Sequence, residues 1–129
     1  MPEPERVAIV GPRDYSDLAR VAEVVAALPL GTVVVTGGAR GVDRAAEAAA
    51  RRAGLEVELW LPDYRRSGRA APLKRNETIA ERCTRMIAFH DGTSRGTAHA
   101  IACARRCGRR VQVLPPRRAA DSGSSGVSV

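Results

Sequence analysis

The chain has 129 residues, a length typical of one domain with a substantial core. Apolar residues make up 44% of it but aromatic residues only 3%, so the core must be built from aliphatic side chains. No apolar run approaches the roughly 20 residues of a membrane span, and the first residues lack the pattern of a signal peptide. With three cysteines, an odd number without metal-site spacing, the sequence predicts a cytoplasmic protein with reduced thiols, no membrane contact and no metal.

The net charge of +7 comes almost entirely from arginine, because Lys74 is the only lysine. Such a basic chain is typical of nucleic-acid-binding proteins. However, the pairs Arg51-Arg52 and Arg105-Arg106 each close a helical pattern just before a glycine, where the negative end of a helix favours cations. We therefore favour a solvated arginine surface over a dedicated nucleic-acid groove, and keep nucleic acid as the less favoured partner.

Five β-branched runs alternate with helical patterns along the chain. The strands are predicted at residues 6–10, 32–36, 56–61, 85–89 and 110–114. Ser16 is the expected N-cap of the first helix, Pro72 the start of the third, and Ser94 the N-cap of the fourth. Strand–helix alternation with short connections predicts an α/β fold, a three-layer sandwich with a mainly parallel sheet of about five strands. Residues 1–116 should form this domain, and the basic, Gly/Ser-rich residues 117–129 a disordered tail.

Four successive strands are followed by segments of unusual composition, GPRDYS, TGGARGVD, PDYRRSGR and HDGTSRGT. Connectors at the opposite edge, such as LPLG and RRAG, are ordinary. Because ligands of open parallel sheets bind beyond the carboxyl ends of the strands, we expect the functional groups to gather at that one edge.

The second and fourth of these segments enter helices and are rich in glycine. Gly37, Gly38 and Gly41 allow backbone amides to approach an anion at the positive end of a helix. Gly92 and Gly96 offer the same at the fourth helix, where three hydroxyl side chains are added. Arginines beside both segments present forks that match phosphate. Singly each feature fits a tight turn or a cap, but together they predict a phosphate-bearing ligand.

Three further residues at this edge have candidate roles. Asp43 is suited to accept hydrogen bonds from ribose hydroxyls or to orient a neighbouring arginine, and Tyr15 and Tyr64 are available to stack a base. The alternatives are structural. Asp43 would only stabilise the N-terminus of its helix, and Tyr64 would only pack on the surface.

The segments GPRDY, GGARGVDRAAE, PDYRRSGRAAPLKRN and MIAFHDGTSRGTAHAI, in this order, resemble the SLOG superfamily, specifically its YspA-like (cpYpsA-related) domains. The superfamily includes the Rossmann-like domain of the DNA-processing protein DprA and the LOG phosphoribohydrolases. The resemblance implies a Rossmann-like fold that binds nucleotides or nucleotide-derived ligands through glycine-rich loops. The ligand-binding residues it implies are Gly11, Arg13, Gly37, Gly38, Arg40, Gly41, Asp43, Arg75, Asn76, Gly92, Ser94, Arg95, Gly96 and Thr97.

The chain departs from the LOG enzymes at one catalytic position. Their Gly-Thr-x-x-Glu motif reads here from Gly96 to Ala100, with alanine at the place of the glutamate. The leading expectation is therefore a binding domain, a sensor or processing module for a small phosphorylated nucleotide derivative, with no cofactor and with homo-oligomers left open. The alternatives are hydrolysis of an N-glycosidic or phosphate bond, motivated by Asp43, Asp63 and Asp91, and single-stranded nucleic-acid binding.

Overall fold

The computed structural model describes residues 3–117, and the predicted tail from residue 118 onward lies outside the described residues. Its sheet has five strands, all parallel, in the order β3-β2-β1-β4-β5. The strands are β1 (Arg6–Val10), β2 (Val33–Thr36), β3 (Glu56–Leu59), β4 (Arg85–Phe89) and β5 (Arg110–Leu114). The predicted α/β fold is confirmed, and the central strands are buried on both faces as all-parallel sheets require.

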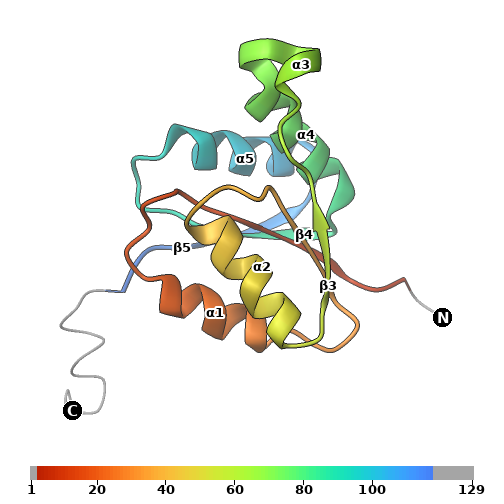
Figure 1. The fold of residues 1–129 in the computed structure, drawn as a ribbon, viewed down its shortest axis with the longest axis vertical. Coiled ribbons are helices and arrows are strands. Elements are labelled where there is room, and N and C mark those ends of the chain that lie inside the picture. The colour runs from red at the N-terminus through yellow and green to blue at the C-terminus, as the bar shows by residue number, and fades with distance from the viewer. Residues whose placement is uncertain (1–2, 118–129) are drawn as a thin grey trace.

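Helices cover both faces of the sheet (Figure 1). The helices α1 (Leu18–Ala26) and α2 (Val42–Arg52) pack on one face, and α4 (Ala71–Arg82) and α5 (Arg95–Arg106) on the other. The chain changes face after β3, so β1 and β4 are neighbours whose following helices lie on opposite faces. Such a switch point leaves a crevice at the carboxyl ends of the strands. The sequence did not predict the short α3 (Tyr64–Ser67) and the 3₁₀ turn η1 (Gly68–Ala70), which stand away from the sheet.

Two expectations about the start of α1 are wrong. The N-cap is Asp17, not Ser16, because the Asp17 side chain accepts a hydrogen bond from the Arg20 amide at 3.3 Å. Tyr15 is buried and cannot stack a base: its ring packs edge-on against Phe89 at a centroid distance of 5.6 Å, and its hydroxyl donates to the Leu114 carbonyl. Tyr15 is therefore part of the hydrophobic core on the α1 and α2 face of the sheet.

Arg117, assigned to the tail by its composition, is instead held against α1. Its Nε lies 2.8 Å from Asp17 Oδ2, and its Nη1 lies 3.0 Å from Glu23 Oε1. Hydrogen bonds from Arg117 lower the pKa of Asp17 to about 2. The ion pairs therefore extend the folded part to residue 117. Among residues 3–117, no helix combines the length and apolar character needed to cross a membrane.

Candidate functional site

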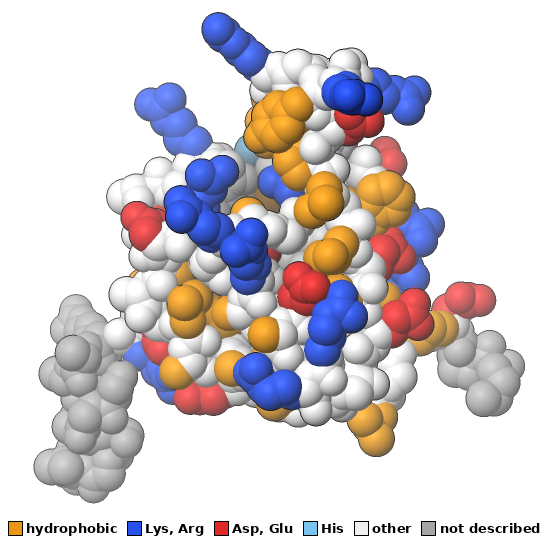
Figure 2. All heavy atoms as spheres, in the orientation of Figure 1, with side chains coloured by type: hydrophobic (Ala, Val, Ile, Leu, Met, Phe, Trp, Pro, Cys, Tyr) orange, Lys and Arg blue, Asp and Glu red, His pale blue; other side chains and the backbone are white. Residues whose placement is uncertain are grey.

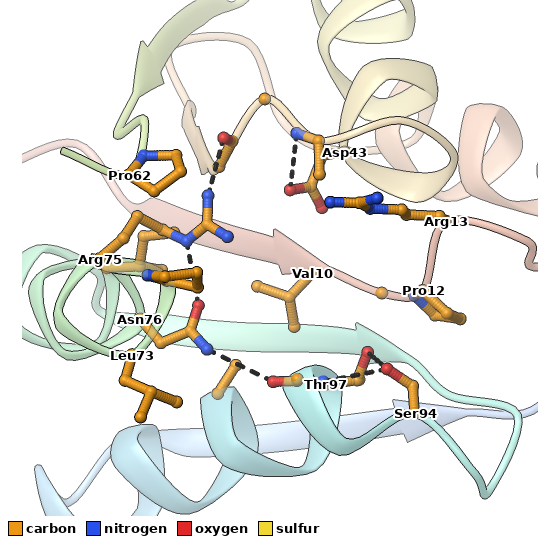
Figure 3. Close-up of a pocket in the computed structure, with 18 of the residues that line it drawn as sticks. Val10, Pro12, Arg13, Asp43, Pro62, Leu73, Arg75, Asn76, Ser94 and Thr97 are labelled. Atoms are coloured by element: carbon orange, nitrogen blue, oxygen red, sulfur yellow. Dashed lines mark hydrogen bonds between the residues drawn. The ribbon is translucent and has the colours of Figure 1, made fainter. Parts of the chain in front are cut away.

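A cavity of about 730 Å³ opens at the carboxyl ends of the strands (Figure 3). It is lined by residues from all four of the segments singled out in the sequence. Ten of the expected site residues line it: Gly11, Arg13, Gly37, Gly38, Asp43, Arg75, Asn76, Ser94, Gly96 and Thr97. The other four, Arg40, Gly41, Gly92 and Arg95, lie beside it in the chain without lining it. The gathering of functional groups at one edge follows from the parallel topology.

The loop between β2 and α2, residues 37–41, is here called the glycine loop. A side chain at Gly37 would collide with the guanidinium of Arg75 and come within 3.0 Å of Asp43 Oδ2. Gly41 has a φ of 81°, and a side chain there would collide with the Arg13 carbonyl. Gly41 is therefore required by the fold, because backbone atoms of the segment after β1 fill the space of a side chain, whereas Gly37 leaves the space that the Arg75 guanidinium occupies.

The segment between β4 and α5, residues 91–96, is here called the serine loop. Asp91 Oδ1 accepts hydrogen bonds from the Thr93 and Ser94 amides at 2.9 and 3.1 Å, and these bonds lower the pKa of Asp91. The Ser94 hydroxyl accepts from the Thr97 amide at 3.2 Å, which confirms it as the N-cap of α5. Gly96 has open space where a side chain would begin. The loop is thus folded by its own side chains and presents Gly96 to the cavity.

Backbone donors remain unused in both loops. Within residues 3–117, the N–H groups of Gly38 and Arg40 in the glycine loop and of Arg95 and Gly96 in the serine loop donate to no protein group. Gly38 and Gly96 line the same cavity. Free amides at the start of a helix carry partial positive charge and attract anions. The two helix entries therefore face one shared cavity, into which Gly38 and Gly96 bring unpaired N–H groups.

Arg75 ties the two halves of the site together. Its Nη1 donates to the Gly37 carbonyl at 2.9 Å and to the Trp60 carbonyl at 3.3 Å, and its Nε donates to Asn76 Oδ1 at 3.1 Å. Most of the N–H groups of Arg75 therefore donate to other protein groups, so its main role is to position the glycine loop. In Figure 3 the remaining amino group of Arg75 points into the cavity.

Asn76 links α4 to α5 beneath the cavity. It is buried, and its Nδ2 lies 3.1 Å from His99 Nδ1 and 3.4 Å from the Gly96 carbonyl. Nδ2 can only donate, so His99 Nδ1 accepts in this arrangement. His99 itself does not line the cavity. Asn76 therefore fixes the backbone of the serine loop from below, while Arg75 fixes the glycine loop.

Asp43 is the most buried acid of the site, with 6% of its surface exposed. Burial raises its pKa from 3.8 to about 6, although the hydrogen bond from the Ala39 amide and the charge of Arg75 both oppose the rise. Figure 3 shows the Arg13 side chain extending toward this carboxylate. Asp43 Oδ2 accepts a hydrogen bond from the Ala39 amide at 3.2 Å, so the carboxylate orders the glycine loop from inside.

Several lining residues were not among the expected site residues. They are Val10, Pro12, Asp14, Ala39, Leu61, Pro62, Tyr64, Pro72, Leu73, Ile79, Asp91, Thr93 and Ala100. Five of these thirteen, Leu61, Pro62, Tyr64, Pro72 and Leu73, are apolar or aromatic residues of the stretch from the end of β3 to the first turn of α4, which carries no glycine-rich signature. In residues 3–117 no cluster of three or more His, Cys, Asp or Glu side chains is arranged to hold a metal ion.

Comparison with known proteins decides the family. The family model described as "YspA, cpYpsA-related SLOG family" matches residues 5–66. The "Gene 61 protein" of Mycobacterium phage D29 is 36% identical over 113 residues, which cover 80% of this chain and 90% of the phage protein. The chain belongs to the YspA-related SLOG family.

Solved structures share the fold of this SLOG domain. DNA processing protein A (DprA) from Streptococcus pneumoniae has a TM-score of 0.77 at 24% identity, covering 95% of this chain. This chain spans only 54% of that protein. DprA from Helicobacter pylori, described for its single-stranded DNA binding mode, has a TM-score of 0.68 at 21% identity, with 91% of this chain and 68% of that one covered. At these identities the likeness shows a common Rossmann-like fold.

The Asp43 environment makes stability depend on pH. A carboxyl whose pKa is raised on folding contributes stability that is complete below about pH 4 and is lost as the pH rises through about 6. Asp43→Asn cannot ionise yet still accepts from the Ala39 amide. We expect it to exceed the wild type in unfolding free energy by about 3 kcal/mol at pH 7, and by much less at pH 4.

Urea denaturation at both pH values measures this difference. Asp14→Asn, which removes an exposed carboxylate from the same cavity, is the control. A constant difference between Asp43→Asn and wild type from pH 4 to 7 would show that Asp43 is not held in a desolvated environment.

Proposed function

We propose that this SLOG domain binds a small phosphorylated, nucleotide-derived ligand in the cavity and acts as a sensor or processing module. The observation that carries the proposal is the set of unpartnered amides at two helix entries that open into one cavity. Arg13 and the free amino group of Arg75 add positive charge beside them. Phosphate is the group that such an arrangement of amides and guanidinium groups fits best. The family membership is consistent with a nucleotide as the bearer of that phosphate.

Hydrolysis is the weaker alternative at the same edge. Asp63 is the N-cap of α3 and does not line the cavity, and Asp91 is engaged by the amides of its own loop. Of the three carboxylates considered from the sequence, Asp43 alone is buried in the cavity and able to hold a proton near neutral pH. A single such acid without a matched base supports binding better than bond cleavage.

A negative charge placed at Gly96 tests whether the amides of the serine loop bind an anion. Gly96→Asp places a carboxylate in open space at the start of α5, a position where an acid does not disturb a helix. We expect it to weaken binding of nucleoside 5′-monophosphates at least about tenfold, because a repulsion worth roughly 1.4 kcal/mol is a factor of ten.

Isothermal titration calorimetry with the four common nucleoside 5′-monophosphates and with cyclic dinucleotides makes the measurement. Ala98→Asp, an exposed position in the same first turn that does not line the cavity, should bind as the wild type does. If the wild type binds none of these compounds, or Gly96→Asp binds them equally well, the proposed function is wrong.

Single-stranded nucleic acid is a second candidate, favoured by the exposed arginines near the cavity. Arg65, Arg66 and Arg69 stand on α3 and η1, and within residues 3–117 none of them forms an ion pair with a carboxylate. Figure 2 shows basic side chains projecting from this end of the molecule. Arginines elsewhere, such as Arg82 and Arg117, are paired with acids. The DprA similarity is consistent with this candidate.

Fluorescence anisotropy with a labelled oligothymidylate at several salt concentrations tests it. Changing Arg65, Arg66 and Arg69 to alanine should reduce the slope of log affinity against log salt by about 2, since each lost phosphate contact contributes about 0.7. The control changes Arg52 and Arg105, at the opposite edge of the sheet, to alanine. An equal loss per arginine in the control would mean nonspecific attraction to the net charge.

A further inference from the structure

Large apolar side chains are exposed mainly at one place. Among residues 3–117 the exposed ones are Leu18, Leu30, Leu59, Leu61, Tyr64, Leu73 and Val113. Four of the seven come from the stretch that runs from the last residue of β3 into the first turn of α4, residues 59–73. Three of these four line the cavity, together with two prolines, and the five residues Leu61, Pro62, Tyr64, Pro72 and Leu73 are here called the apolar wall. Exposed apolar side chains that line one cavity are typical of ligand-binding clefts.

The apolar wall adjoins the anion-binding part of the cavity. Leu61 lies directly over the glycine loop, since a side chain placed at Gly38 would come within 2.6 Å of Leu61 Cδ2. Leu61 and Tyr64 are nonetheless 65% and 58% exposed. No residue of α3 or η1 is buried, so this segment does not contribute to the hydrophobic core. A ligand whose phosphate meets the amides of the glycine loop therefore has the wall as its next neighbour.

The chemistry of the wall restricts what it can bind. It contains no charged side chain, and its one polar side-chain atom is the hydroxyl of Tyr64. Tyr64 is also the one aromatic residue left free: Tyr15 and Phe89 pack against each other, and Trp60 donates to Glu58 Oε2 at 2.5 Å under the guanidinium of Arg82. Two prolines, two leucines and one tyrosine ring offer flat, uncharged contacts, which suit the face of an aromatic ring.

We propose that the apolar wall binds the aromatic base of the ligand by its face, while the phosphate of the same molecule is held by the loop amides. This inference rests on the proposed function and specifies it. Because the wall has almost no hydrogen-bonding groups for the edge of a base, it distinguishes a nucleotide from a bare sugar phosphate but not one base from another. The domain thus selects a ring attached to a phosphate, with weak preference among the four common bases.

Calorimetric titration of the full chain with the four nucleoside 5′-monophosphates and with ribose 5-phosphate tests this selectivity. The four nucleotides should bind within about fivefold of one another, and ribose 5-phosphate at least about tenfold more weakly, because ribose 5-phosphate has no base to stack on the wall. Ribose 5-phosphate binding as tightly as the nucleotides would overturn the role of the wall while leaving the proposed function intact. Failure of all five compounds, and of inorganic pyrophosphate, to bind would overturn both.

Variants of the wall provide the second measurement. Tyr64→Ala and Leu73→Ser alter exposed side chains, so the fold should tolerate both. Each should weaken nucleotide binding about fivefold or more and leave ribose 5-phosphate binding unchanged. Leu30→Ser, at the most exposed leucine and away from the cavity, is the control and should change neither. Equal weakening of nucleotide and ribose 5-phosphate binding, or unchanged nucleotide binding in both variants, would show that the wall does not hold the base.

Discussion

The site depends on one contact, the hydrogen bond from the Arg75 guanidinium to the Gly37 carbonyl. Arg75 belongs to α4 on one face of the sheet, and Gly37 begins the loop that leads to α2 on the other. The absence of a side chain at Gly37 is what permits this contact, because any side chain would occupy the space of the guanidinium. Since Arg75 also holds Asn76, and Asn76 lies beneath Gly96, the same chain of contacts sets the relative position of the two loops.

The glycines of the site divide into two groups by their role. At Gly11 and Gly41 backbone atoms leave no room for a side chain, and at Gly37 the space is taken by the Arg75 guanidinium, so substitutions at these positions would disturb packing. Gly96 has open space where a side chain would begin, so packing does not require a glycine at this position. Asp43 has a structural role as well: its Oδ2 accepts a hydrogen bond from the Ala39 amide and so orders the glycine loop, while burial raises its pKa to about 6.

The features of the fold and the site that the sequence predicted are those that local sequence patterns determine. The alternation of strands and helices predicted a parallel sheet. In such a sheet the loops that carry Gly38 and Gly96 must lie at the same edge. Ser94 was recognisable as a cap from its position alone. The burial of Tyr15 could not be predicted, because it depends on contacts with Phe89, which lies 74 positions away in the chain. The apolar wall and the use of Arg75 on backbone carbonyls likewise arise only from tertiary contacts.

The central claim is that the glycine loop and the serine loop form a single anion site. Amide chemical shifts in ¹⁵N-labelled protein, followed during titration with adenosine 5′-monophosphate, test it directly. We expect the amides of Gly38, Arg40, Arg95 and Gly96 to shift together and to follow one dissociation constant. Shifts confined to one loop, or two loops that saturate at different concentrations, would contradict the claim.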